Sequence, residues 1–384
     1  MLHTWQGFLI NNISISTLKG RLTGMTSLGI LQWSPSEKDY YLKKVALSCV
    51  KEGIQVFSIS PSDLRINSSI VTGMQFNEKS IMWDRKTFLL PEYIYDRCFY
   101  SSAQDSRKDA VAKVKTLKNK VTFLGSGLPN KWAVYQWLKN ESSLRNFLPP
   151  TQLLSETCFN SYLTTFNKIV IKPVFGSGGK GFYVIKQTGE AVKLYDRENS
   201  LILKEKDRAT FFKKLKKFLP LLGSGFILQP YMHLQINEQP FDLRVVVQKY
   251  APDKWNIIGQ GFRMGKRGML VSNLVTGGEI HSFNDFPLSF PPSLKKKIKQ
   301  LSRIIPTVLE KNHSPLFELG IDFGIDHQKR LWILEVNSKP GYETILQTTS
   351  ASDHYRVFQG PIQLIKELEK EKYQKEQEKL LGSH

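Results

Sequence analysis

Short apolar runs alternate with amphipathic stretches through the first 124 residues, and this pattern predicts a small α/β domain. Residues 28–32 and 54–59 are predicted strands, and residues 39–52 between them have apolar positions at helical spacing. A strand–helix–strand order indicates a parallel sheet. Three more strands and a short basic helix complete the predicted domain, at residues 81–88, 93–100, 121–124 and 109–119.

A second region begins near residue 125, where the loop GSGLPN leads into a helix that starts at Lys131. Pro149 and Pro150 interrupt the chain after that helix, because proline cannot continue regular backbone hydrogen bonding. The apolar runs that follow predict strands at residues 168–174, 182–186, 191–196, 226–229, 243–250, 256–263 and 331–337. Helices are predicted at residues 207–219, at 292–311 with a kink at Pro306, and from about 363.

Composition narrows the class of protein. No stretch reaches the length of about 18 apolar residues that a membrane span needs. The first residues lack the features of a secretory signal, and three scattered cysteines argue against a disulfide framework or a zinc site, so the cytoplasm is expected. The formal charge of +20 favours an anionic partner. The lysine clusters at 213–217 and 295–299 have the spacing of solvated helix faces, so sequence-specific nucleic-acid binding is not expected.

A glycine-rich segment follows the strand at 168–174. Gly176, Gly178 and Gly181 have the G-x-G-x-x-G spacing, but they lead into a predicted strand, whereas a dinucleotide fingerprint opens a helix. A Walker A loop is excluded because glycine, not serine or threonine, follows the lysine of this segment. A glycine loop between antiparallel strands can close its backbone N–H groups over phosphates, and Lys172 would add a positive charge. The alternative is an ordinary hairpin turn.

Two short phrases are shared with protein kinases. Residues 191–193 (AVK) are similar to the kinase lysine strand, and residues 322–324 spell DFG. No His-Arg-Asp catalytic loop lies between them in the sequence, and no Ala-Pro-Glu segment follows. The sequence therefore lacks the catalytic base and a metal ligand of the kinase template, which argues against that class.

Residues 319–341 (LGIDFGIDHQKRLWILEVNSKPG) predict a β-hairpin that folds about the polar turn 326–330. Asp322 then lies opposite Glu335, and Asn337 shares their face, because side chains alternate across a strand. Two opposed carboxylates repel each other, and a Mg²⁺ ion held by oxygen ligands and phosphates would remove that cost. The alternative is a solvated polar face. The other face is predicted to be an apolar seam with the facing pairs Ile321–Val336 and Phe323–Leu334.

These features together resemble the ATP-grasp superfamily. Its motifs occur here in order across residues 125–345, at Lys131, Lys172, the glycine loop, 229–232, 242–244 and 335–337. The phrases FDLRVVVQK, VSNL..GG and EVNSKPG are most similar to the YheC/YheD-like proteins linked to bacterial endospore coats. Glutathione synthetases and the ribosomal-protein glutamate ligases resemble the chain more distantly.

The resemblance implies an α/β (α+β) fold with three parts. An N-terminal, parallel-sheet pre-ATP-grasp domain would span residues 1–124, an ATP-grasp domain 125–350, and a C-terminal helix and tail 351–384. Within the ATP-grasp domain, a small lobe would span about 165–228 and a large lobe about 229–350 together with 125–164. Both lobes would contain mostly antiparallel sheets.

The resemblance also implies a role for each site residue. The residues expected to bind ATP are Lys131 and Lys172 at the phosphates, Gly178 and Gly179 in the covering loop, Gln229, Tyr231 and Met232 at the hinge beside adenine, Asp242 near the ribose and phosphates, and Asn273 in the acyl-phosphate pocket. The catalytic residues would be Arg263, facing the acyl phosphate, and Arg244, near the phosphates. The Mg²⁺ ligands would be Asp322, Glu335 and Asn337.

The implied activity is an ATP- and Mg²⁺-dependent ligation of a carboxylate to an amine or a thiol through an acylphosphate. Many relatives carry His-Arg before the paired glycines where this chain has Val275 and Thr276, so the identity of the substrate does not carry over. The alternative is a non-catalytic ATP-binding or structural protein of the coat. The expected partners are ATP, an unidentified carboxylate and amine, and spore coat components or an anionic polymer.

Overall fold

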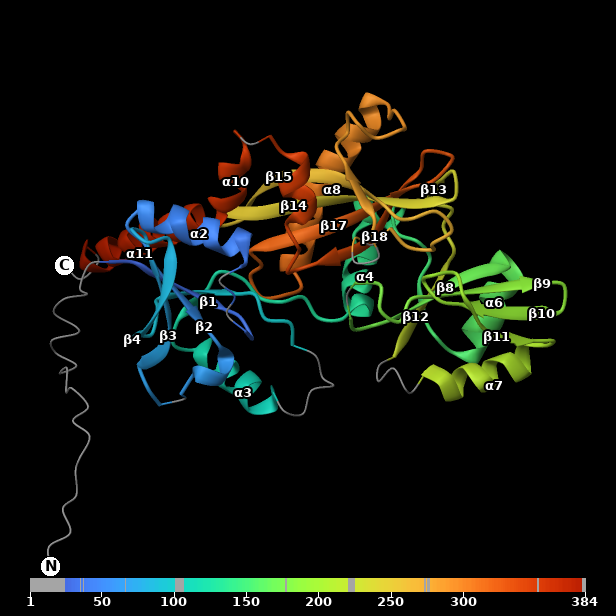
Figure 1. Cartoon of the computed structure of the whole chain (residues 1–384), viewed down its shortest axis with the longest axis horizontal. Helices are drawn as coiled ribbons and strands as arrows, with labels where there is room; N and C mark the ends of the chain where they lie inside the picture. Colours follow the sequence, from blue (N-terminus) through green and yellow to red (C-terminus); the bar gives the residue numbers. More distant parts are fainter. Residues whose placement is uncertain are drawn as a thin grey trace, which may run out of the picture. The chain divides into compact units, whose positions relative to one another are not determined.

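The computed structural model of the protein describes residues 25–381 apart from positions 35, 37, 66, 101–106, 177, 220–224, 273, 275–276 and 351. The described residues form two compact units (Figure 1). One contains the described residues of 25–98 and 107–123, and the other contains those of 99–100 and 124–381.

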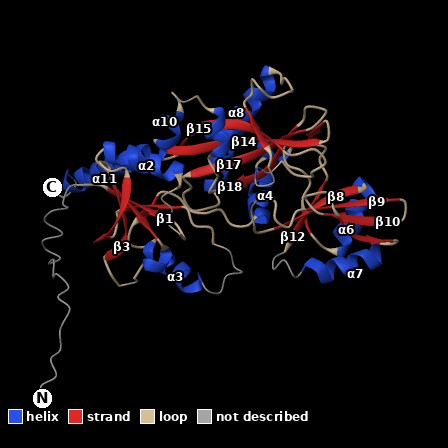
Figure 2. Cartoon of the chain, viewed as in Figure 1, coloured by secondary structure: helices blue, strands red, loops and turns tan. Residues whose placement is uncertain are grey.

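The first unit is built on a six-stranded, largely parallel sheet with the order β4-β3-β2-β1-β5-β6. Four strands run parallel, namely β1 (Ser27–Leu31), β2 (Gln55–Ile59), β5 (Tyr93–Asp96) and β6 (Thr122–Phe123). An antiparallel hairpin forms one edge, from β3 (Ile70–Asn77) and β4 (Met82–Leu89). Two helices lie on opposite faces of the sheet (Figure 2), α2 (Tyr40–Lys51) and α3 (Lys108–Leu117), and the short η1 (Pro61–Asp63) follows β2. The predicted parallel sheet is confirmed.

Two details of this sheet differ from the sequence prediction. Strand β3 was not predicted, because Gly73 interrupts its apolar pattern. A Cβ atom at Gly73 would lie 2.6 Å from the backbone oxygen of Ser58, so the strands approach too closely there for a side chain. Strand β5 is shorter than the predicted strand at 93–100. The Asp96 carboxylate accepts a hydrogen bond from the Cys98 N–H at 2.9 Å, which turns the chain away from the sheet.

The second unit contains two further sheets, and the first of them belongs to the small lobe. Its order is β11-β10-β9-β8-β12-β7, and all neighbouring pairs are antiparallel. The strands are β7 (Gln152–Leu153), β8 (Lys168–Pro173), β9 (Tyr183–Thr188), β10 (Ala191–Tyr195), β11 (Leu201–Glu205) and β12 (Phe226–Pro230). Phe159 of α6 (Glu156–Phe166) stacks on Phe211 of α7 (Arg208–Phe218), and both helices cover the apolar side of the sheet.

The other sheet of the second unit belongs to the large lobe and has the order β16-β15-β14-β17-β18, with β13 beside β14. The strands are β13 (Gln235–Ile236), β14 (Gln239–Ala251), β15 (Lys254–Met264), β16 (Glu279–His281), β17 (Glu318–Ile325) and β18 (Leu331–Asn337), all antiparallel. One face packs against α4 (Lys131–Asn140), which is followed by the short α5 (Ser142–Arg145), and α8 (Pro292–Glu310), which continues through Pro306. The antiparallel lobes confirm the predicted fold class.

On the opposite face of the large-lobe sheet, described helices of the second unit cover one end. Helix α9 (Glu343–Thr348) lies close to β15, because Gly259 has no side chain; a Cβ atom there would lie 2.3 Å from Ile345. After α10 (His354–Phe358), the start of α11 (Gly360–Leu381) packs against Gln248 of β14. Polar side chains occupy the other end of this face. None of the helices in the described part of the chain has the length and hydrophobicity needed to cross a bilayer.

Candidate active site

Neighbouring strands place five of the predicted site residues on one face of the large-lobe sheet. Asp242 on β14 pairs in register with Arg263 on β15, and Arg244 on β14 pairs with Asp322 on β17. Glu335 on β18 lies opposite Asp322 in turn. Because residues two apart on a strand share a face, these five side chains form a continuous polar row.

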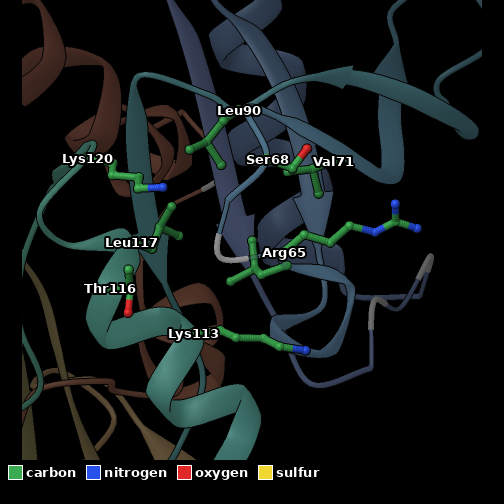
Figure 3. A pocket seen from close by; sticks show the side chains of 9 residues that line it. Arg65, Ser68, Val71, Leu90, Lys113, Thr116, Leu117 and Lys120 are labelled. Carbon is green, nitrogen blue, oxygen red and sulfur yellow. The ribbon is translucent and has the colours of Figure 1, made fainter.

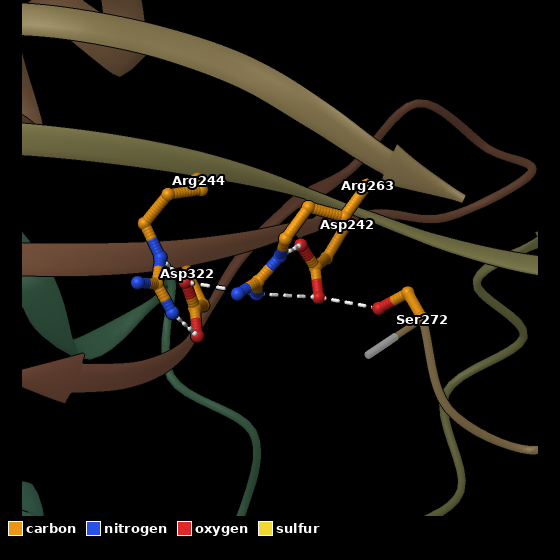
Figure 4. Close-up of polar contacts among 5 residues, drawn as sticks. All are labelled: Asp242, Arg244, Arg263, Ser272 and Asp322. Carbon is orange, nitrogen blue, oxygen red and sulfur yellow. Dashed lines mark hydrogen bonds and ion pairs between the residues drawn. The ribbon is translucent and has the colours of Figure 1, made fainter. Parts of the chain in front are cut away.

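The row contains paired hydrogen bonds between arginine and aspartate (Figure 4). Arg244 donates to Asp322 from Nε at 2.5 Å and from Nη2 at 2.9 Å. Arg263 donates to Asp242 in the same way, at 2.7 and 2.8 Å, and its Nη2 also lies 3.1 Å from Oδ1 of Asp322. Ser272 donates from its hydroxyl to Oδ2 of Asp242 at 2.5 Å. We call these five side chains the arginine–aspartate network.

Burial and charge act in opposite directions on the two aspartates. Burial raises the pKa of Asp242, and the negative charge of Asp322 adds to this rise although Arg263 opposes it. Burial also disfavours the charged form of Asp322, but the charges of Arg244 and Arg263 hold its pKa below the usual value. The two arginines therefore make Asp322 the stronger acid of the pair.

A second set of charges links the glycine loop to the acidic hairpin. The Lys131 ammonium, at the start of α4, lies 3.5 Å from Oε1 of Glu335 and donates a hydrogen bond to the carbonyl of Gly176. Lys172, on β8, is close enough for the charges of Glu335 and Lys131 to affect it. Desolvation lowers the pKa of Lys172 and Lys131 lowers it further, whereas Glu335 raises it.

The glycine loop adopts a backbone that requires glycine. Gly176, Gly178, Gly179 and Gly181 have φ angles of 119°, 69°, 69° and 74°, and side chains disfavour this region of backbone space. The loop contacts α4 through Lys131, whose backbone N–H donates to the Val174 carbonyl at 2.9 Å in addition to the side-chain bond. From the sequence, this segment was either a phosphate-covering loop or a simple turn. The structure places two lysines and one carboxylate at the base of the loop, and this arrangement favours the phosphate-covering loop.

Of the predicted hinge residues, Gln229 lies in strand β12, beside β8, and Tyr231 and Met232 follow that strand. The Gln229 side chain donates to the Thr151 hydroxyl at 2.8 Å, so it has a structural partner. The Tyr231 backbone N–H donates to the Lys168 carbonyl at 3.0 Å, and the Lys168 ammonium lies 3.5 Å from the centre of the Tyr231 ring. The Met232 carbonyl accepts a bond within the following turn. Of the predicted set, Asn273 lies outside the described residues.

The hairpin register was predicted correctly at the acids and wrongly beyond them. Asp322 faces Glu335 and Ile321 faces Val336, as predicted, but Phe323 faces Ile333 instead of Leu334. A β-bulge between Asp322 and Phe323 places two residues of β18 against one of β17. Ile333 therefore enters the apolar core, and Leu334 is the additional, half-buried residue.

The hairpin's polar face contains oxygen ligands of the kind that Mg²⁺ prefers. Asn337 lies opposite Gly320 and two residues from Glu335, so it shares the face of both acids. Among the described residues, no three His, Cys, Asp or Glu side chains converge as a metal-binding group. A cation here would therefore rest on two carboxylates, one amide and ligand oxygens, which is a composition that suits Mg²⁺.

Charge repulsion between the two acids is already offset by the protein's own cations. The hairpin sequence has no lysine or arginine between Asp322 and Glu335 on their shared face, and from the sequence a Mg²⁺ ion was the expected counter-charge, with a solvated polar face as the alternative. In the structure, Arg244 and Lys131 come from other elements and pair with Asp322 and Glu335 respectively. The repulsion argument for a metal is therefore weaker than the hairpin alone indicated.

Ser272 is a member of the network that sequence reasoning missed as a site residue. It stands in the phrase VSNL, which marked the region, but the residue singled out there was its neighbour Asn273. No spacing rule predicts that a hydroxyl 30 positions from Asp242 contacts that carboxylate.

Two hollows in the first unit contain none of the predicted site residues. One is lined by residues such as Arg65, Lys113 and Lys120 (Figure 3), and its cavity volume of about 10 Å³ is too small for more than a water molecule. The other has a volume of about 240 Å³ and is lined in part by Trp83 and Arg85.

Comparisons with known proteins agree with the fold. D-alanyl-alanine synthetase A from Vibrio cholerae has a TM-score of 0.54 at 12% identity, with 89% of this chain and 99% of that chain covered. The ADP complex of N5-carboxyaminoimidazole ribonucleotide synthetase has a TM-score of 0.52 at 10% identity, covering 83% and 71%. At these identities the likeness concerns the fold, which is that of the ATP-grasp ligases.

Sequence relatives narrow this class further. The chain belongs to the YheC/D-like ATP-grasp family, whose model matches residues 120–368. The endospore coat-associated protein YheC of Bacillus subtilis (strain 168) is 31% identical over 343 residues, with 85% of this chain and 91% of the relative covered.

Proposed function

We propose that the chain is an ATP-dependent ligase that activates a carboxylate as an acylphosphate and joins it to an amine or a thiol. The observation that carries the proposal is the meeting of Lys131, Lys172 and Glu335 at the base of the glycine loop. Two cations beneath a loop of backbone N–H groups suit the phosphates of ATP. The ligase fold of the structural relatives supports the same reaction class.

In the proposed reaction, a substrate carboxylate oxygen attacks the γ-phosphorus of ATP, the bond from that phosphorus to the β–γ bridging oxygen breaks, and ADP leaves. The substrate amine then attacks the acyl carbon, the bond between that carbon and the phosphate oxygen breaks, and phosphate leaves with the proton of the amine passing to solvent. Phosphoryl transfer needs alignment and charge neutralisation more than a protein nucleophile. Lys131 and Lys172 would neutralise phosphate oxygens, and Arg263 and Arg244 would stabilise the acylphosphate.

Asp322, Glu335 and Asn337 are the proposed ligands of magnesium. When bound, the ion would neutralise and orient phosphate oxygens. Both oxygens of Asp242 already accept hydrogen bonds from Arg263 or Ser272, and both oxygens of Asp322 accept from Arg244. Asp242 at the ribose and Asp322 at the ion would therefore each exchange a protein partner for the ligand.

Glu335→Gln tests the proposal because the amide has almost the same shape but lacks the charge. ADP release from Mg·ATP would be measured across amino acids, peptides and cell-wall precursors. We expect the variant to fold like the parent and to lose ADP formation by more than about 100-fold, as several kcal/mol of transition-state stabilisation would disappear. The matched control is Glu343→Gln, an exposed glutamate of α9, which should leave the rate unchanged. Equal rates for the parent and Glu335→Gln would remove Glu335 from the site.

Nucleotide binding and catalysis are separated by a second measurement. Mg·ATP at about 100 times its dissociation constant should stabilise the chain by roughly 2.7 kcal/mol and raise its melting temperature. A clear shift without ADP formation for any substrate would favour the alternative, a non-catalytic ATP-binding coat protein.

We also propose an association with the endospore coat, as the name of the YheC relative suggests. The basic helices α7 and α8 and a formal charge of +20 suit an anionic polymer. Binding of the purified chain to isolated spore coats should weaken steeply with salt. Salt-independent binding, or none, would contradict an electrostatic association.

A further inference from the structure

The segment that follows β15 contacts both lobes of the second unit. Its Leu270 backbone N–H donates to the carbonyl of Arg197, in the turn between β10 and β11 of the small lobe, at 2.9 Å. Its start is bonded to the large lobe, because the Gly265 backbone N–H donates to the carbonyl of Pro240, on β14, at 2.8 Å. Ser272 therefore follows a segment whose backbone is bonded to the large lobe at Gly265 and to the small lobe at Leu270.

The Ser272 hydroxyl reaches the network at one specific atom. It donates to Oδ2 of Asp242 at 2.5 Å, and the same oxygen accepts the Nη2 donor of Arg263 at 2.8 Å. That Nη2 also lies 3.1 Å from Oδ1 of Asp322. Ser272 is buried, with 9% of its surface exposed, so water does not readily replace its bond.

We propose that Ser272 is a positioning residue that holds Arg263 in its working orientation through the Asp242 carboxylate. A carboxylate held only by one arginine can rotate together with it, whereas a third donor on Oδ2 fixes the plane of the carboxylate and hence the direction of the guanidinium. In this role Ser272 acts through its hydrogen bond to Asp242. The inference rests on the proposed role of Arg263 for its catalytic consequence, but the orientation of that side chain can be measured independently.

The orientation of Arg263 is tested by NMR on the full chain with ¹⁵N-labelled arginine, in which Arg263→Lys identifies the Arg263 Nε–H signal. In Ser272→Ala we expect that signal to shift and its hydrogen exchange to accelerate roughly fivefold, as suits the loss of one hydrogen bond. Ser272→Thr keeps the hydroxyl and should preserve the signal. Ser282→Ala is the matched control, because it removes an exposed serine–aspartate bond of the same length, 2.5 Å to Asp285.

The catalytic consequence is tested by steady-state kinetics once a substrate is found. Ser272→Ala should lower kcat about tenfold with an unchanged KM for ATP, and Ser272→Thr should restore it. An Arg263 signal that is unchanged in Ser272→Ala, or changed equally in Ser282→Ala, would overturn the inference. If Ser272→Ala does not fold, Ser272→Cys replaces it, and a parent-like Arg263 signal in the cysteine variant, whose thiol is a weak donor, would refute the role. Absence of ligase activity in the parent would refute the proposed function while the NMR result still decides the positioning role.

Discussion

Replacing Arg244 with methionine is expected to destabilise the second unit by about 3 kcal/mol, the lower end of the range for breaking a buried ion pair. Arg244 and Asp322 are 8% and 7% exposed, so the charge left behind cannot be hydrated freely. Arg244 makes both hydrogen bonds of the pair, at 2.5 and 2.9 Å, and its removal leaves Asp322 with one contact to Arg263 at 3.1 Å. Because this contact with Arg263 remains, the expected loss of stability lies at the lower end of the range for breaking a buried ion pair.

A double-mutant cycle separates the cost of the orphaned charge from the loss of packing. Asp322→Asn added to Arg244→Met removes the uncompensated carboxylate, so the double variant should be more stable than the sum of the single variants predicts, by about 1–3 kcal/mol. The matched control is Arg330→Met, because Arg330 pairs with Asp326 at 2.8 Å but its side chain is 58% exposed; it should cost no more than about 1 kcal/mol.

The assay is urea unfolding followed by tryptophan fluorescence, with the transitions of the two units fitted separately. Trp255 and Trp332 report on the large lobe. A cost below about 1 kcal/mol for Arg244→Met, or an additive cycle, would refute the view that the network is a desolvated, mutually dependent set.

Two further predictions concern lysines. Lys172→Met should weaken ATP binding about 10- to 100-fold, because one charge-assisted contact to phosphate is lost. The control variant Lys213→Met, at an exposed lysine, should bind ATP like the parent. Titration of a fluorescent ATP analogue measures both affinities, and equal affinities for Lys172→Met and the parent would exclude Lys172 from the phosphate site. Burial and the charge of Lys186 lower the pKa of Lys168 from 10.5 to about 8, so between these values the unfolded chain binds more protons and stability contributed by Lys168 rises with pH. Lys168→Arg, which stays charged, should flatten that rise in urea unfolding at pH 8 to 10; identical slopes would contradict it.

The elements that the sequence predicted well are those whose apolar spacing is regular. The strand–helix–strand start of the first unit and the strand that carries Lys172 have uninterrupted apolar patterns, and both are present. The elements that were missed lack such a pattern. Strand β11 exposes Leu201 and Ile202 at the edge of its sheet, and β3 contains a glycine that the close approach of Ser58 requires. Edge exposure and close backbone approach depend on neighbours distant in sequence.

The hairpin acids could be placed from sequence because the two strands share one short turn, which fixes their register. The bulge at Leu334 could not be predicted, because no residue type or spacing in the hairpin sequence marks the position where β18 has one residue more than β17. The pairing of Asp322 with Arg244 depends on the register between β14 and β17, which are separated by 66 residues of intervening chain between Ala251 and Glu318. Local pattern rules do not reach such contacts.

The lysines near the hairpin acids differ in how freely they can bind an incoming phosphate. Lys131 contacts both Glu335 and the Gly176 carbonyl, so an incoming phosphate must compete with bonds that already exist. Lys172 presents the opposite case, because desolvation lowers its pKa and a phosphate would restore the favourable environment of its charge. In the proposed function, the charged form of Lys172 is therefore stabilised most by nucleotide binding. Lys131 exchanges its present partners for phosphate, and the link that it forms between the glycine loop and Glu335 is lost. The affinity for ATP would then depend more on Lys172 than on Lys131, although both lysines are proposed to bind the same phosphates.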